Sequence, residues 1–293
     1  MSVVLALGAA VVFGSADFLG GLASRRRAAL SVAFGAQAAG ILVLAVVLPF
    51  LGPATVTPHD VLLGGLGGMF GGGGLVLLFH SLAKGPMSVV APVAALAAST
   101  VPIVAGFLLG ERPGGAALLG MAVALGAVVL ITREGPSETV PDGIGPGAAV
   151  ATTVRATPAV AGTALLAGSM FGLFFVCLHG TGDDSGLYPL LAARLASVPL
   201  IAAITLGRGQ RLRPALVGRG AAVGLASGVL DMAANVLYLV ALRHGLLAVV
   251  SATTGLYPAA TVILAQTVLE ERMRRTQLAG LAIAGLAVGL VAL

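Results

Sequence analysis

Residues 2–21 read SVVLALGAAVVFGSADFLGG, and every residue in this stretch except Asp17 is apolar or small. A helix needs about twenty such residues to cross the roughly 30 Å hydrocarbon core of a bilayer. A carboxylate at that depth is costly unless it faces a partner or a wet cavity. The stretch therefore predicts a transmembrane helix and marks Asp17 as a candidate functional residue.

The composition of the whole chain favours lipid over water as its solvent. The sequence is 58% hydrophobic and 9% charged, with a mean hydropathy of +1.07, whereas soluble domains carry about 25% charged residues. The net charge of +5 would also suit a nucleic-acid partner, but the basic residues lie in short loops between apolar runs, where they orient membrane proteins. We expect a protein embedded in the bilayer, without a nucleic-acid partner.

Runs of about twenty apolar residues predict ten transmembrane helices. The expected spans are residues 2–22, 28–50, 60–82, 87–110, 114–132, 159–179, 186–206, 217–242, 246–269 and 276–293. The predicted fold is therefore an all-α polytopic membrane protein. Its single cysteine, Cys177, lies inside a span and cannot form an intramolecular disulfide.

The chain reads as two five-helix halves, residues 1–132 and 159–293, joined by a flexible linker at 133–158 that is rich in Pro, Gly, Ser and Thr. Shifting the second half back by 160 positions superposes Glu271-Arg272 on Glu111-Arg112, which indicates an internal repeat. Because five is odd, the second half must enter the membrane from the opposite side. The sequence thus predicts a 5+5 inverted-topology repeat.

The basic residues support this topology independently. Thirteen of the sixteen Lys and Arg residues fall on one side of the ten predicted spans, while Arg112 and Arg243 fall on the other side. Short loops rich in Lys and Arg stay in the cytoplasm. We therefore expect a multi-pass protein of the cell (inner or cytoplasmic) membrane with both termini outside.

The sequence resembles the drug/metabolite transporter superfamily, and within it the EamA-like transporter family with two EamA repeats. The resemblance rests on LAKGPMSVVAPVAAL at 82–96 and LRHGLLAVVSATTGLYP at 242–258, and GSADFLGGLASRR at 14–26 is similar to the opening of one bacterial subgroup. It implies a secondary transporter without a cofactor. Two features depart from the family: the chain has no Trp in its first helix, and members are often drawn with both termini inside.

A polar stripe in span 217–242 is the strongest site candidate. Ser227, Asp231 and Asn235 follow one another at i, i+4 and i+8 on one helical face, with Tyr238 adjoining. Such a face must point away from lipid. It predicts either the lining of a substrate cavity or a hydrogen-bonded seam between helices.

Two further polar residues, Arg194 and Gln37, occupy equivalent places in spans 186–206 and 28–50. An arginine at that depth needs a counter-charge, and Asp231 on the next span is the nearest candidate. Arg194 could form a structural ion pair or contact the substrate directly. Asp17 could carry a proton, extend toward the cytoplasmic interface or bond to neighbouring backbone.

Glycines and prolines mark candidate sites of packing and gating. Gly64, Gly68 and Gly72 recur at every fourth position and predict a groove for close helix packing. Three prolines interrupt backbone hydrogen bonding within spans, either as a moving gate or as simple kinks. They are Pro92, Pro102 and Pro258. Because these glycines and prolines and the polar stripe are concentrated there, we expect spans 60–82, 87–110, 217–242 and 246–269 to line the cavity.

Other motifs carry weaker predictions. Glu111 and Glu271 predict a structural role, such as pairing with the next arginine or neutralising a helix start. The histidines lack metal-ligand spacing, so no metal site is expected. Gly180-Thr181-Gly182-Asp183 resembles the G-x-G-D motif of intramembrane aspartyl proteases, but the second aspartate, usually after Tyr, is missing. An intramembrane enzyme and a non-transporting sensor or assembly partner are the alternatives.

The expected substrate is a small polar or amphiphilic metabolite, amino acid-like or drug-like, which the protein exports by alternating access. A single lysine, Lys84, argues against a sugar-phosphate site, and the scarcity of aromatic residues, 4% of the chain, gives little support to an aromatic cage for cations. Two intramembrane acids against one arginine suit a zwitterionic or weakly cationic molecule. The sequence leaves open whether protons are coupled and whether the chain forms a homodimer.

Overall fold

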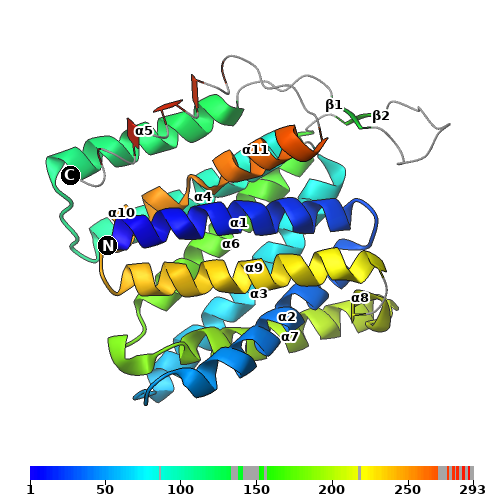
Figure 1. The fold of residues 1–293 in the computed structure, drawn as a ribbon, viewed down its shortest axis with the longest axis horizontal. Coiled ribbons are helices and arrows are strands. Elements are labelled where there is room, and N and C mark those ends of the chain that lie inside the picture. Colours follow the sequence, from blue (N-terminus) through cyan, green and yellow to red (C-terminus); the bar gives the residue numbers. More distant parts are fainter. Residues whose placement is uncertain are drawn as a thin grey trace.

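The computed structural model describes residues 1–85, 87–132, 138–140, 152–154, 157–216 and 219–269, with scattered helical residues between 276 and 290. The described part is a bundle of long helices (Figure 1). The helices are α1 (Ser2–Ser24), α2 (Ala29–Val47), α3 (Pro58–Lys84), α4 (Met87–Leu108), α5 (Gly115–Thr132), α6 (Pro158–His179), α7 (Tyr188–Gly207), α8 (Arg213–Leu216), α9 (Arg219–Leu242), α10 (Leu247–Thr254) and α11 (Tyr257–Leu269). Two short 3-10 turns, η1 (Leu48–Phe50) and η2 (Asp183–Ser185), follow α2 and α6.

Among the residues that the structure describes, eight helical segments are long and apolar enough to cross a membrane, against the ten expected. The fifth expected span corresponds to α5. Its apolar segment within the described residues, Gly115–Ala127, is shorter than a full membrane span. The tenth, 276–293, lies mostly outside the described residues, and Glu271 lies outside them altogether. In the expected linker, β1 (Glu138–Val140) and β2 (Thr152–Val154) pair as antiparallel strands.

Large apolar side chains are exposed on the outer surface of the bundle, as a lipid-facing surface requires. Leu108 is 83% exposed, Leu62 68% and Leu42 67%, although each lies in a helix long enough to span a bilayer. In water such exposure would favour aggregation, whereas in hydrocarbon it costs little. The surface therefore supports a multi-pass membrane protein.

Local sequence signals fix where the helices start. Thr57 accepts a hydrogen bond from the Asp60 backbone, and the Asp60 carboxylate accepts one from the Thr57 backbone, which forms a capping box at the start of α3. Thr157 caps α6 by accepting from the Val160 backbone. A proline at the first helical position, Pro58 or Pro158, completes each start because it needs no amide partner there.

The expected span 246–269 is confirmed by the apolar segment Leu247–Ala265, which is long enough to cross a membrane, but it is not one continuous helix. The structure breaks it between α10 and α11 at Gly255 and Leu256, just before Pro258. A Cβ on Gly255 would collide with the Ser99 hydroxyl of α4, so the break is held against α4 by close packing. By contrast, α4 continues through Pro92 and Pro102 without interruption.

The two halves pack against each other reciprocally. Helix α1 lies beside α9, α10 and α11, and α6 lies beside α3 and α4; α1 and α9 run side by side in Figure 1. A Cβ on Gly68 of α3 would collide with the Ala193 backbone of α7, and a Cβ on Gly228 of α9 would collide with the Ala36 backbone of α2. Gly228 follows Gly68 by 160 positions, so the crossing of α3 with α7 is repeated by the crossing of α9 with α2.

Candidate functional site

A cavity inside the bundle gathers most of the polar residues predicted from the sequence. It has a volume of about 500 Å³, including its part open to solvent. Its lining residues come from both halves of the chain: Phe13, Asp17, Gln37, Gly71, Leu75, Ala98, Phe171, Phe174, Phe175, Arg194, Asp231, Asn235 and Tyr257. The cavity is thus built by α1, α2, α3, α4, α6, α7, α9 and α11, twice as many helices as expected.

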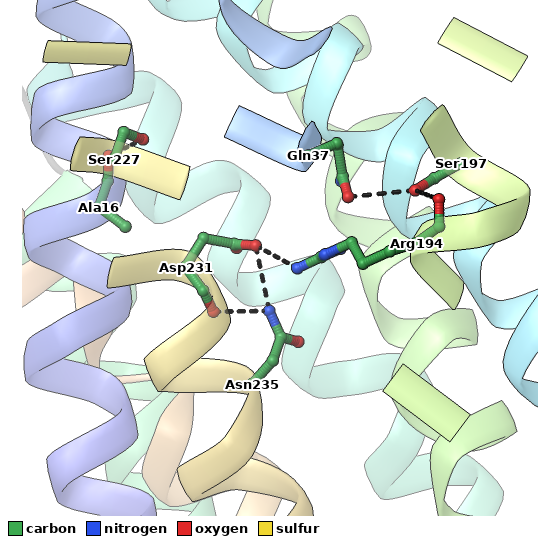
Figure 2. Close-up of polar contacts among 7 residues, drawn as sticks. All are labelled: Ala16, Gln37, Arg194, Ser197, Ser227, Asp231 and Asn235. Atoms are coloured by element: carbon green, nitrogen blue, oxygen red, sulfur yellow. Dashed lines mark hydrogen bonds and ion pairs between the residues drawn. The ribbon is translucent and has the colours of Figure 1, made fainter. Parts of the chain in front are cut away.

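The centre of the polar wall is an ion pair between α7 and α9. Arg194 Nη2 donates to Asp231 Oδ2 across 2.6 Å, and Asn235 Nδ2 donates to the same oxygen at 3.2 Å and to the Asp231 backbone carbonyl at 2.7 Å. In Figure 2 the three side chains converge from two helices. The predicted counter-charge for Arg194 is confirmed, and Asn235 holds the carboxylate in place from one helical turn away.

Two polar atoms of this cluster lack a partner among the described residues. They are Arg194 Nε, which can donate, and Asn235 Oδ1, which can accept. The Asn235 amide points its Nδ2 toward Asp231, because both Asp231 oxygens that it contacts are hydrogen-bond acceptors. Buried polar atoms without a partner are rare in native structures and deserve an explanation. Here they are polar groups that a bound molecule could satisfy.

Gln37 joins the same wall from α2. Ser197 donates to Gln37 Oε1 at 3.1 Å, which links α7 to α2 directly beside Arg194 (Figure 2). Arg194 comes directly after Ala193, the residue that Gly68 meets in the crossing of α3 with α7. In the same way, Gln37 comes directly after Ala36, the residue that Gly228 meets in the crossing of α9 with α2. The packing therefore supports the equivalence of Arg194 and Gln37.

Asp17 lines the cavity from α1, the helix that packs beside α9. It is 9% exposed, so it does not extend to the membrane interface, and it makes no hydrogen bond or ion pair with any residue that the structure describes. It is close enough to Asp231 and Tyr257 to interact with both electrostatically. Neither bonding to neighbouring backbone nor extension toward the interface, two of its predicted roles, accounts for this position.

The predicted polar stripe divides between cavity and helix contacts. Asp231 and Asn235 line the cavity, whereas Ser227 donates to the Ala16 carbonyl of α1 at 2.8 Å (Figure 2). Tyr238 is fully buried, and its hydroxyl pairs with that of Ser251 in α10 at 2.6 Å. Both alternatives for the stripe therefore apply, to different residues.

An aromatic wall was not predicted from the sequence. Five of the thirteen aromatic residues line the cavity, namely Phe13, Phe171, Phe174, Phe175 and Tyr257. The Phe175 ring lies 4.1 Å from the ring of Tyr238, in a stacked arrangement, and 6.1 Å from that of Phe13. Low aromatic content concealed this concentration. The spacing of the three α6 phenylalanines, which places them on one helical face, was the signal available.

The gating and packing candidates lie outside the cavity lining. Gly64, Gly68 and Gly72 of α3 face α7, where a Cβ would meet Pro189, Ala193 and Ser197 respectively. Pro92, Pro102 and Pro258 are not among the lining residues. Of the candidate groove region only the neighbouring Gly71 reaches the cavity, beside Phe174 of α6.

Loops of the two halves are fastened together at one end of the bundle. The Gly182 amide donates to Asp60 Oδ1 at 2.7 Å, and the Thr55 amide donates to the Asp184 carbonyl at 3.0 Å. Arg243, directly after α9, donates to the carbonyl of Gly186 in the same loop as Gly182 and Asp184, at 2.8 Å. Burial lowers the pKa of Arg243 from its usual value, and the nearby acids Asp183, Asp60 and Asp184 oppose that shift. The segment that resembles G-x-G-D thus takes part in an exposed loop contact.

Glu111 fastens the halves at a second point. Its two carboxylate oxygens accept from the backbone amides of Leu247 at 2.6 Å and Ala248 at 2.9 Å, at the start of α10. A carboxylate there satisfies amides that have no partner within the helix and favours the positive end of its dipole. The predicted neutralisation of a helix start is confirmed for Glu111, although the helix belongs to the other half.

Within the part of the chain that the structure describes, no group of three His, Cys, Asp or Glu residues could hold a metal ion. The cavity offers hydrogen-bonding groups, charges and aromatic surfaces. Its lining combines an ion pair, two buried polar atoms of the same cluster without a described partner, and a carboxylate that pairs with no described residue.

Comparisons with known proteins agree with this architecture. No curated protein sequence matches the chain. The chain is similar to a solved crystal structure described only as that of a protein, with a TM-score of 0.68 and 18% identity over 97% of this chain and 96% of the other. At that identity the likeness concerns the fold alone. The model of the EamA-like transporter family matches residues 1–133 and again residues 159–293, so the chain belongs to the EamA-like transporter family.

Proposed function

We propose that the protein is a secondary transporter that exports a small polar or amphiphilic metabolite, amino acid-like or drug-like, across the cytoplasmic membrane. The observation that carries this proposal is the cavity shared by both halves, which combines a buried ion pair, unpartnered polar atoms and an apolar wall. Ligand sites in proteins are mostly apolar with a few placed polar groups. Intramembrane ionisable residues mark substrate or ion pathways.

The proposed architecture is a ten-helix 5+5 inverted repeat, with halves 1–132 and 159–293 joined by the segment 133–158. The family match to each half, the odd number of spans per half and the repeated Gly68 and Gly228 crossings support it. Rocking of one half against the other would expose a shared cavity to each side in turn. The one-sided distribution of basic residues supports termini on the outer side.

Within the cavity, we assign substrate or proton binding to Asp231, Asn235, Arg194, Gln37 and Asp17. Asp17 is the candidate proton carrier, because a buried carboxylate without a described partner is the group most readily neutralised by a proton. Ser227 and Tyr238 stabilise the cavity indirectly, because their hydrogen bonds hold α9 against α1 and α10.

The test compares untargeted metabolite profiles inside and outside cells with and without the protein, followed by transport of each altered compound in proteoliposomes. We expect at least one compound to accumulate outside producing cells and to cross proteoliposome membranes only when the protein is present. A protein of normal abundance that changes no metabolite and moves no compound would favour a sensor or assembly partner instead.

A further inference from the structure

The two walls of the cavity differ in charge balance, which bears on the class of ligand. On the polar wall, Arg194 and Asp231 neutralise each other across 2.6 Å. On the aromatic wall, Asp17 has no cation beside it among the described residues. When Asp17 has released its proton, the cavity carries one uncompensated negative charge, on a carboxylate one helical turn from Phe13.

The aromatic residues line the same cavity as this carboxylate. Phe13 lies one helical turn before Asp17 on α1, and both line the cavity. The Phe13 ring lies 6.5 Å from that of Tyr257 and 6.1 Å from that of Phe175, and Phe175 lies 5.5 Å from Phe174. Aromatic faces attract cations, and the attraction increases when the cation is removed from water.

The unpartnered polar atoms match a donor on the ligand. Asn235 Oδ1 is a buried acceptor without a described partner, and the Asp17 carboxylate, when ionised, can accept hydrogen bonds but cannot donate any. A protonated amine supplies up to three N–H donors for such acceptors. A carboxylate on the ligand could accept from the buried, unpartnered Arg194 Nε, but it would compete with Asp231 for the guanidinium.

From this geometry we infer that the cavity binds a monovalent organic cation: a protonated amine on an apolar or aromatic body, with the ammonium between Asp17 and Asn235 and the body against the phenylalanines. This inference rests on the proposed transport function and narrows its substrate class. A zwitterion would leave its carboxylate poorly compensated beside a guanidinium already in an ion pair, so the site discriminates against it.

The experiment uses three probes with one phenyl ring and different charge. Phenethylamine carries +1, phenylalanine is zwitterionic and 3-phenylpropionate carries −1 near neutral pH. Binding to the purified, detergent-solubilised full chain is measured by calorimetry. We expect phenethylamine to bind at least about tenfold more tightly than phenylalanine, because it alone neutralises Asp17 without adding an anion.

Variants assign the preference to its residues. Asp17→Asn should abolish the tenfold preference, whereas Asp17→Glu, which keeps the charge, should retain it. Phe13→Leu should weaken phenethylamine binding by roughly threefold to tenfold through loss of the cation–π contact. The matched controls are Asp184→Asn in the exposed α6–α7 loop and Phe50→Leu, whose side chain is 86% exposed, and both should bind like the unmodified protein.

The inference is overturned if the folded protein binds phenethylamine no better than phenylalanine, or if folded Asp17→Asn keeps the preference. Transport distinguishes this failure from failure of the proposed function. Proteoliposomes that move phenylalanine or another zwitterion but not the amine would overturn the cation site and leave the transporter intact. Tight amine binding without any flux would support the cation site and count against the transporter.

Discussion

Arg194 and Asp231 lie on different helices and meet through a 2.6 Å contact in the lining of a cavity shared by both halves. Two buried charges must be matched, because removal of one partner leaves the other uncompensated. The pair therefore has a structural role whatever its function, and an experiment must separate the two.

The first prediction separates them with a double variant. Asp231→Asn leaves the guanidinium unpaired and should lower stability by roughly 3 to 5 kcal/mol. Adding Arg194→Gln removes the unpaired charge and should restore membrane abundance but not transport, because the substrate or proton site has lost its charges. Transport and abundance are measured in both variants. Full transport by the double variant would show that the pair serves only as scaffold.

The second prediction concerns close packing of α3. Gly68→Leu should reduce abundance and thermal stability, because the Cβ of the new side chain would collide with the Ala193 backbone of α7. Overpacking of this kind costs typically about 1 to 3 kcal/mol. Gly126→Leu in α5 is the control, since a Cβ there meets no described atom within 4 Å. Similar thermal stability of the two variants would contradict the importance of the crossing.

The third prediction concerns orientation in the membrane. Thr55 and Asp184 share one end of the bundle through a backbone hydrogen bond, and we expect that end to be outside. In a Cys177→Ala background, single cysteines at exposed positions 26, 55, 184 and 211 are treated with an impermeant thiol reagent on intact cells. Positions 55 and 184 should react. Reaction at 26 and 211 alone would reverse the proposed orientation.

The fourth prediction concerns Glu111 as the cap of α10. Glu111→Ala removes both acceptors for the Leu247 and Ala248 amides and should cost about 0.5 to 2 kcal/mol, the range for a lost helix cap. Glu111→Gln retains one acceptor and should cost less. The adjacent, exposed Arg112→Ala is the control in thermal unfolding. Equal melting temperatures for Glu111→Ala and the control would exclude the capping role.

Much of the site follows from local properties of the sequence. Hydropathy identifies the spans, and chain position within a span sets the depth of Asp17, Arg194 and Asp231, because each residue adds about 1.5 Å along a helix. The cost of an intramembrane charge then indicates that Arg194 needs an acid, and Asp231 is on the next span. These inferences require no knowledge of which helices touch.

Tertiary structure alone brought Asp17 to Asp231 and assembled the aromatic wall. Whether α1 lies beside α9 depends on many weak contacts, such as Gly8 against Leu237 and Gly20 against Ser227, and none of these is visible in a hydropathy profile. The same holds for Glu111, whose amide partners lie 136 and 137 positions away. Local sequence thus determined the depth of each polar group in the membrane, and helix packing determined which of those groups face one another.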